Sequence, residues 1–477
     1  MTEVEASRGK NLSFLQRLLY AAGNFPVGFG PTAVSAWLAY YYYGRQNDSG
    51  EPVILVSAIS FGVITLMCNV LNAFTDPAVG YLSDRTRSKW GRRKPWVIAG
   101  APLLAISFFF LWTPVTQYPS FENSVVLFIA LLSFWFAFTV VVAPYVSLLP
   151  EITPYDDERV SISAFMGLFE ITGTIFGSAL WPVLTGLAAG GALFLATGEQ
   201  VIAMAAGAVL LIFIITSVLV VPESYKVEED HVQAKGSIWS RVMGELLSTF
   251  SNRVFIPYVI GVGFYRMAVS TVVFIAPFLA AKVIAAYTPT TMDLELLGSI
   301  GAVDAHNQVN WEEAAGLMMA LVLVGAALFF PLVSWLANKF GKRQMFILAL
   351  TWFGIVMIAL SLIGLLPVWS PLFQAFALFL AAAFPVSIAM VVMRPLLADV
   401  IDTDEGITGK RREGVYNGME GFMMKVAAGL GPMIGGVSFE IFGHSTTGNL
   451  GIRLCGPFAG VCLLAAALAF TKYPIMK

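Results

Sequence analysis

Charged residues are scarce in this sequence. Only 12% of its 477 residues are charged, whereas 57% are hydrophobic. An ordinary soluble chain carries about 25% charged residues, so this composition excludes a typical soluble domain. No cluster of basic residues is interleaved with aromatic ones. Nucleic acid is therefore excluded as a partner.

Cysteine and histidine are rarer still. The three cysteines, Cys68, Cys455 and Cys462, each lie in an apolar stretch. There we expect reduced thiols packed as small hydrophobic groups, without a disulfide or a metal site. The three histidines are far apart, and the sequence contains no His-Glu-x-x-His pattern, no Gly-x-Ser-x-Gly elbow and no phosphate-binding loop. A membrane enzyme, an ATP-driven pump and a bound cofactor are all disfavoured.

Long apolar stretches, by contrast, recur along the whole chain. Each is long enough for a membrane-spanning helix, which needs about 20 residues. They are uniformly apolar and lack the short alternating pattern of an outer-membrane barrel. We therefore predict an all-α membrane protein with twelve transmembrane helices. The stretches cover residues 18–43, 53–80, 95–113, 124–149, 162–187, 200–221, 254–282, 313–337, 344–366, 371–399, 415–440 and 451–471.

The polar segments between these stretches indicate how the chain is organised. Most lysines and arginines fall in segments on the same side of the membrane as both termini, which the positive-inside rule identifies as cytoplasmic. The loops at 80–94 and 333–343 are both short, basic and glycine-containing, which indicates an internal repeat. We predict an amino-terminal six-helix bundle at 1–221, a cytoplasmic linker at 222–253 and a carboxy-terminal six-helix bundle at 254–477.

Three sequence patterns carry a family resemblance. They are Asp76-Pro77 followed by the basic segment from Gly80 to Trp96, Ala398-Asp-Val-Ile-Asp402, and Gly409-Lys-Arg-Arg-Glu-Gly414. In these patterns and their spacing the chain resembles the glycoside-pentoside-hexuronide:cation symporters, the melibiose-carrier-like family of the major facilitator superfamily. The resemblance implies two pseudo-symmetric bundles, transport by alternating access, a monomer and a bacterial inner membrane. The segment 169–177, FEITGTIFG, also looks like the fifth helix of the sodium-dependent lysophosphatidylcholine transporters.

Asp76 is the leading candidate for a functional residue. A carboxylate inside an apolar helix costs several kcal/mol unless it is paired or hydrated. Asn72 and Thr75 lie beside it, and Thr139 on the fourth helix offers another oxygen suited to a hard cation. The resemblance implies that these four residues hold the coupling cation, with Lys425 close by. The alternative is a static ion pair between Asp76 and Lys425.

The coupling ion and the substrate stay open. Relatives usually carry a second aspartate at the position of Asn72, so either Na⁺ or H⁺ fits the site, and a metal role for Asp76 applies only to Na⁺. The matching sugar-binding positions fall near Phe29, at Val142, at Gly167 and at Val146, which offer few polar partners for a sugar. The expected solute is a glycoside or a related small organic molecule, and the alternative is an amphipathic lysolipid.

Three charged residues of the apolar stretches are candidates for substrate binding and coupling. Glu170, Arg266 and Lys425 together offer a site for a zwitterionic headgroup. Alternatively, Glu170 and Arg266 pair with each other as an interhelical gate. Arg394 is expected to reach the cytoplasmic surface in a structural role.

The basic loop after the second helix has a different expected role. Asp84, Arg85, Arg92 and Arg93 are expected to latch the two bundles together through ion pairs and helix-end carbonyls. A channel is the remaining rival class. An internal repeat around a buried carboxylate suits alternating access better than it suits a continuous pore.

Overall fold

The structure is a computed structural model. It describes residues 12–46, 52–153, 155–189, parts of 207–220, 244, 247–299, 302–303, 309–409 and 412–474. Within these ranges the ordered elements are helices, and the only β contacts are two isolated bridges, Gln46 with Pro52 and Val303 with Val309. The predicted all-α class is confirmed.

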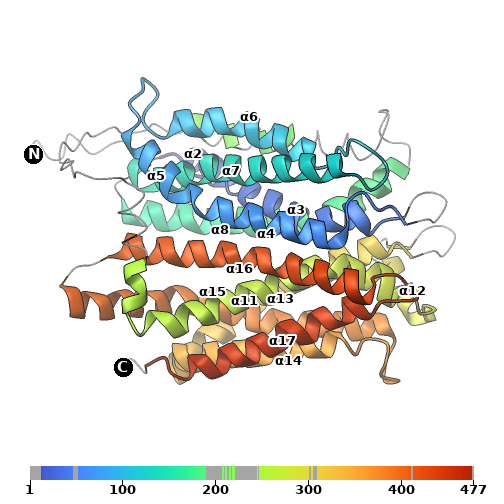
Figure 1. Ribbon diagram of the computed structural model, residues 1–477. Coiled ribbons are helices and arrows are strands. Elements are labelled where there is room, and N and C mark those ends of the chain that lie inside the picture. Colours follow the sequence, from blue (N-terminus) through green and yellow to red (C-terminus); the bar gives the residue numbers. More distant parts are fainter. Residues whose placement is uncertain are drawn as a thin grey trace, which may run out of the picture.

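The first half of the chain forms a bundle of long helices (Figure 1). Most of the sixth predicted helix, at 200–221, and of the linker, at 222–253, lies outside the described residues. The described helices are α2 (Phe14–Ala22), α3 (Phe25–Tyr43), α4 (Ala58–Ala73), α5 (Thr75–Arg85), α6 (Lys94–Phe110), α7 (Phe121–Ile152) and α8 (Asp156–Ala189).

The second half forms another bundle beside the first. Its helices are α11 (Phe255–Phe278), α12 (Thr291–Ser299), α13 (Trp311–Phe340), α14 (Lys342–Leu360), α15 (Pro371–Thr408), α16 (Glu413–Phe442) and α17 (Leu450–Phe470). A π-helical turn, Leu279–Ile284, continues α11. Across the described residues of both bundles, nine helical segments are long and apolar enough to cross a membrane, and α6 is a shorter apolar helix.

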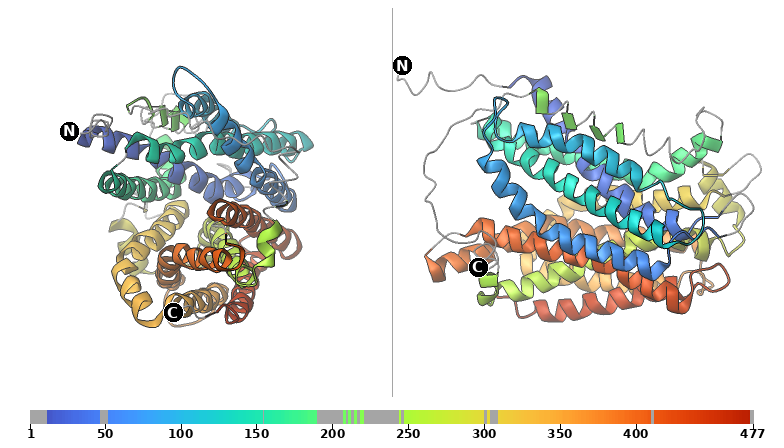
Figure 2. Two further views of the ribbon diagram at one scale, coloured as in Figure 1. Left: turned by 90° about the vertical axis from the view of Figure 1, so that its left-hand side faces the viewer. Right: turned by 45° about the horizontal axis from the view of Figure 1, so that its top comes forward.

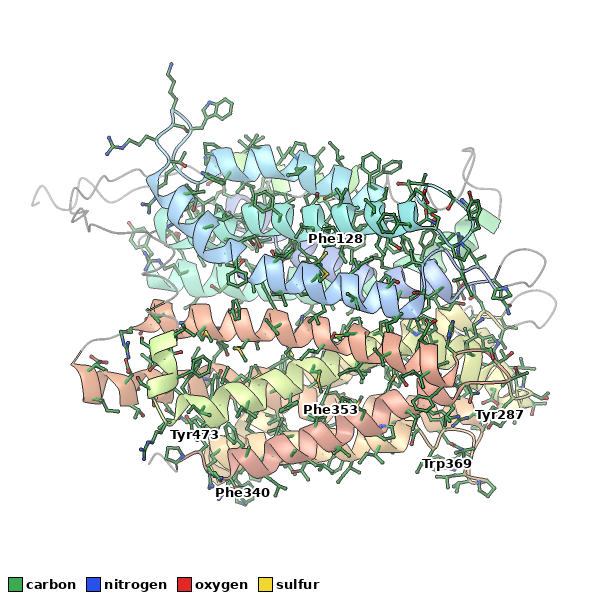
Figure 3. All side chains as sticks on the ribbon, viewed as in Figure 1. Phe128, Tyr287, Phe340, Phe353, Trp369 and Tyr473 are labelled. Atoms are coloured by element: carbon green, nitrogen blue, oxygen red, sulfur yellow. The ribbon has the colours of Figure 1, made fainter. Side chains whose placement is uncertain are left out.

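The described chain begins and ends at the same end of the molecule, on the left of Figure 1, which we call the terminal end. Seen from that end, the two bundles lie one above the other (Figure 2). Tyr473 is near the terminal end, whereas Tyr287 and Trp369 mark the opposite, or far, end (Figure 3). Helices α3, α8, α11 and α16 therefore run from the terminal end to the far end, and α4, α15 and α17 run back.

Two helices that were predicted to be continuous are broken. The stretch 18–43 divides into α2 and α3 at Gly23 and Asn24, and the stretch 53–80 divides into α4 and α5 at Phe74. A proline follows each break, Pro26 and Pro77, and its missing N–H leaves the carbonyl four residues earlier without its helical partner. The second break lies immediately before Thr75 and Asp76.

The two bundles are in close contact at the far end. A Cβ atom added at Gly436 of α16 would lie 2.2 Å from the carbonyl oxygen of Ala58 on α4. Beside this contact the ring of Tyr43 on α3 lies 5.3 Å from that of Phe278 and 5.8 Å from that of His444. Because such a contact admits no side chain larger than hydrogen, glycine is required at this helix crossing.

The same helix faces diverge toward the terminal end. Gly80 follows Asp76 by one turn of α5, and Gly421 precedes Lys425 by one turn of α16, so each pair shares a face. A Cβ atom at Gly80 or Gly421 would meet no atom within 4 Å. The space between the bundles is therefore open at the terminal end and closed at the far end.

Candidate functional site

Asp76 lies where the broken second helix resumes. It is the second residue of α5, so its carboxylate lies in the first turn of that helix. A negative charge is stabilised there by the partial positive charge of the helix amino terminus. The Asp76 side chain is 43% exposed, which places it at the edge of the open space between the bundles.

Lys425 on α16 reaches Asp76 across the boundary between the bundles. Its Nζ atom lies 2.6 Å from Oδ1 of Asp76 and donates to the backbone oxygen of Asn72 at 3.3 Å. The Lys425 side chain is 24% exposed. This ion pair joins the amino-terminal bundle to the carboxy-terminal one.

Thr139 and Thr75 complete the surroundings of the carboxylate. The Oγ1 atom of Thr139 on α7 donates to Oδ1 of Asp76 at 3.0 Å. The hydroxyl of Thr75 donates to the backbone oxygen of Asn72 at 2.8 Å. Three helices, α4, α5 and α7, thus bring together the four residues that the sequence indicated for the cation.

The side-chain amide of Asn72 can lie in either of two orientations, and one of them makes more hydrogen bonds than the other. With its nitrogen turned toward the Trp135 carbonyl and the hydroxyls of Thr139 and Thr75, its oxygen accepts from Nζ of Lys425 at 3.1 Å. The ammonium is then surrounded by three oxygen atoms, from a carboxylate, an amide and a backbone carbonyl. Such an oxygen set suits a hard monovalent cation.

Glu170 and Arg266 do not pair in this structure, so the alternative of an interhelical gate between them is not seen here. Oε2 of Glu170 on α8 accepts from Nδ2 of Asn24 at 2.9 Å, at the break between α2 and α3. Arg266 lies midway along α11 and is exposed. In the part of the chain that the structure describes, neither a hydrogen bond nor an ion pair involves Arg266.

The predicted latch is only partly described. Arg92 and Arg93 are half-buried in the turn before α6, whereas the side chains of Asp84 and Arg85 lie outside the described residues. Two close ion pairs at the terminal end lie within the carboxy-terminal bundle. They join Lys342 to Asp399, at 2.6 Å, and Arg412 to Asp404, at 2.5 Å.

One cluster was missed by the sequence reasoning. Glu420 of α16 is buried and accepts a hydrogen bond from Tyr258, and Arg394 approaches it on the other side. The signal was present, because Glu420 lies inside the apolar stretch 415–440, just as Asp76 lies inside the stretch 53–80. The sequence predicted that Arg394 reaches the cytoplasmic surface, but it did not predict that Arg394 also contacts Glu420 within the bundle.

Comparison with known proteins places this site in a family. The MFS/sugar transport protein family matches residues 19–303 and 308–476. The chain is 26% identical to an uncharacterized symporter of Synechocystis sp., covering 91% of this chain and 87% of that protein. It is 23% identical to the sodium-dependent lysophosphatidylcholine symporter 1 of Mus musculus, covering 99% and 87%. It is also 23% identical to the isoprimeverose transporter of Lactiplantibacillus pentosus, covering 96% and 88%.

Solved structures agree on the fold. A point mutant of the nucleoside transporter NupG superposes with a TM-score of 0.67 at 14% identity, covering 96% of this chain and 99% of that one. A bacterial homolog of the human lysosomal transporter Spinster, in an inward-facing and unoccupied conformation, superposes with a TM-score of 0.61 at 14% identity, covering 96% and 95%.

Fold and relatives together define a class. The protein is an integral, multi-pass membrane transporter with the major facilitator fold, and it is not an enzyme. It belongs to the MFS/sugar transport protein family. Its relatives include an isoprimeverose transporter, an uncharacterized symporter and sodium-dependent lysophosphatidylcholine symporters, and the symporters among them support cation coupling.

Proposed function

We propose that this protein is a cation-coupled symporter whose cation binds at Asp76, Asn72, Thr75 and Thr139. The contact of Lys425 with Asp76 carries the proposal, because there an ammonium occupies an oxygen-lined position between the bundles. A coupling cation competes with that ammonium for the same carboxylate.

Exchange of the two cations explains how the ion couples to the solute. When Na⁺ binds the carboxylate, the Lys425 ammonium is released toward the open space, where it attracts a polar or negatively charged solute group. With the solute absent, the site then carries an extra positive charge that opposes closure of the terminal end. Symport follows, because the carrier closes readily only when it is empty or holds both ligands.

Na⁺ is the leading candidate for the coupling ion, and H⁺ is the alternative. The oxygen set around the ammonium fits Na⁺ without a change of protonation. A single carboxylate, with Asn72 in place of a second one, gives the site less negative charge and therefore keeps H⁺ open as the ion.

The solute is proposed to bind between the bundles near Arg266 and Glu170. Arg266 offers up to five N–H donors to that space, and Glu170 offers a carboxylate held by Asn24. Phe29 and Val146 replace charged or ring-stacking groups at the sugar positions. This combination favours a solute with one polar or zwitterionic group and a large apolar part. A lysolipid has these two parts, and so does a glycoside with an apolar aglycone.

The orientation follows from charge distribution. The terminal end carries most of the lysines and arginines and is proposed to face the cytoplasm of a bacterium. On that assignment the structure is inward-open. A monomer is proposed, because both bundles and the site belong to one chain.

A binding experiment tests this proposal. Purified protein in detergent is melted with p-nitrophenyl glycosides or lysophosphatidylcholine, each with Na⁺ or with choline as the counterion. At a ligand concentration about one hundred times the Kd, binding stabilises the native state by about 2.7 kcal/mol. We expect that the stabilisation by Na⁺ is lost in Asp76→Asn and retained in Glu122→Gln, which alters an exposed residue of α7. Equal Na⁺ stabilisation in Asp76→Asn and wild type at matched expression would reject the site and leave a static ion pair.

A further inference from the structure

A second carboxylate lies buried in the carboxy-terminal bundle, and the cation site does not use it. Glu420 is on α16, five residues before Lys425, and its side chain is 6% exposed. The hydroxyl of Tyr258 on α11 donates to Oε1 of Glu420 at 2.5 Å. A buried carboxylate is costly to keep charged without a counter-ion, so we ask which cation lies nearest to Glu420.

That cation is Arg394 on α15, and the distance between its guanidinium and the Glu420 carboxylate is long. Its Nη1 atom lies 3.5 Å from Oε2 of Glu420 and donates to Oδ1 of Asn417 at 3.2 Å. A charge-assisted hydrogen bond is about 2.7–2.9 Å long, so the contact with Glu420 is not a tight one. The Arg394 side chain is 77% exposed. It therefore lies between a buried carboxylate and water.

On its exposed side, Arg394 adjoins the part of α16 that borders the open space between the bundles. Asn417, the hydrogen-bond partner of Arg394, is exposed on α16. Gly414 and Gly421 lie within four residues of it, and a Cβ atom at either glycine would meet no atom within 4 Å. Gly421 lies one turn before Lys425, so this part of α16 adjoins the site proposed for the solute.

Arginine is well suited to a group that enters from this space. Its planar guanidinium matches the geometry of a carboxylate or a phosphate and can bind either one through two parallel hydrogen bonds. Within the described part of the chain only Nη1 makes a hydrogen bond, so the other N–H donors of Arg394 are available.

We infer that Arg394 and Glu420 form a proton-linked anion site at the terminal end of the open space. A carboxylate or phosphate group of the solute binds Arg394, the guanidinium leaves Glu420, and Glu420 takes up a proton from the water there. The proton forms an O–H bond with Oε2, the oxygen that Arg394 leaves, while Tyr258 still donates to Oε1. One negative charge arrives with the anion and one positive charge with the proton, so the net charge of the site is unchanged.

The nearby charges on α15 and α16 have partners of their own: Asp399 pairs with Lys342, Asp404 with Arg412, and Lys425 with Asp76. Among the described residues, α4 carries no charged residue, and Arg453 of α17 lies near the far end. Tyr473 lies beyond Tyr258 and stays neutral, because burial raises its pKa above the ordinary value. Arg266 is about 12 Å further along α11, two helical turns beyond Tyr258. Arg394 is thus the cation that contacts Glu420.

The first test needs no solute. In Arg394→Gln the buried carboxyl of Glu420 has no cation, so we expect it to be protonated at pH 7. Infrared difference spectra should show a carboxylic acid band in Arg394→Gln that is absent from wild type and from the Arg394→Gln/Glu420→Gln double variant. Arg87→Gln, which removes an exposed loop arginine, should show no such band. Absence of the band from Arg394→Gln would overturn the linkage.

The second test uses matched probes in a weakly buffered solution with a pH indicator. The carboxylate probe is p-nitrophenyl glucuronide, compared with the neutral p-nitrophenyl glucoside. The phosphate probe is oleoyl lysophosphatidate, compared with monooleoylglycerol. We expect uptake of about one proton per bound anion in wild type and none with either neutral probe. Whichever anion gives uptake identifies the source of the acidic group, and uptake with neither would overturn the proposal.

Variants complete the second test. Glu420→Gln should bind the anion at least as tightly as wild type but without proton uptake, whereas Glu440→Gln, on the same helix and exposed, should behave as wild type. Proton uptake that persists in Glu420→Gln would also overturn the inference. The inference rests on the proposed transport function only in treating the anion as part of the solute. Failure of this inference is distinguishable from failure of the proposed function, because Glu420→Gln should keep the stabilisation by Na⁺ that depends on Asp76.

Discussion

The far-end contact between the bundles permits a sharp test of alternating access. In Gly436→Ala the new Cβ atom would lie 2.2 Å from the Ala58 carbonyl oxygen, whereas ordinary van der Waals contact begins at 3.4 Å. Helices α16 and α4 must therefore separate there by roughly 1.2 Å, or the far end must open. Overpacking of this kind costs about 1–3 kcal/mol. Opening relieves that cost, so the equilibrium should shift toward the far-end-open state by about 5- to 150-fold.

Spin labels across the far end measure this shift. Tyr118 in the amino-terminal half and Trp369 in the carboxy-terminal half are both exposed, and Trp369 lies at the far end (Figure 3). With labels attached to cysteines at these two positions in a cysteine-free background, electron–electron double resonance gives the distribution of their separation. We expect Gly436→Ala to add a longer-distance population that is minor in wild type.

A matched variant separates this effect from general destabilisation. In Gly456→Ala the added Cβ atom would lie 2.3 Å from the Met357 carbonyl oxygen, an equally close contact between α17 and α14 inside one bundle. It should lower the melting temperature without changing the distance distribution. If Gly436→Ala lowers the melting temperature but leaves the distances unchanged, as Gly456→Ala is expected to do, the far-end contact does not control opening.

Three further predictions concern charge. Asn72→Asp restores a second carboxylate and should tighten Na⁺ binding about tenfold, which a Na⁺ titration of the melting temperature measures. Arg412→Met leaves Asp404 buried without its partner and should destabilise the protein by about 3 kcal/mol, seen by chemical unfolding in detergent micelles and absent in Lys339→Met. Burial lowers the pKa of His444 below the usual value of about 6.5, with Lys282 adding to the effect and Glu440 opposing it. The neutral ring thus stabilises the far-end contact at neutral pH, and this contribution is lost as the pH falls through the lowered pKa of His444. The distance between the spin labels at positions 118 and 369 should therefore lengthen in acid in wild type but not in His444→Asn.

The sequence predicted the helices well because apolar length reports the thickness of the membrane. Apolar length gives no information about helices outside the membrane. It therefore missed the polar extension of α15 to Thr408 and the short helix α12, which lies outside the apolar stretches. The breaks at Gly23 and Phe74 were also missed. Pro26 and Pro77 indicated them, because each follows its break closely and removes a helical hydrogen bond there.

The candidate cation site was predictable for a different reason. Asn72, Thr75 and Asp76 are close in sequence, so local geometry brings them together, and the family resemblance supplied Thr139 and Lys425. The surroundings of Glu170 were not predictable. Its partner, Asn24, is 146 residues away, and only the packing of α8 against the break between α2 and α3 brings the two side chains together. The same holds for Glu420, whose partners come from α11 and α15.

The central claim is that a coupling cation displaces the Lys425 ammonium from Asp76. Equilibrium binding of radioactive Na⁺ to purified protein tests it most directly in wild type, Lys425→Met and Asp76→Asn, repeated from about pH 5 to pH 8 so that competition by H⁺ is visible. The account predicts saturable binding in wild type, tighter binding in Lys425→Met because the competing ammonium is gone, and no binding in Asp76→Asn. Undiminished binding in Asp76→Asn, or weaker binding in Lys425→Met than in wild type, would contradict it.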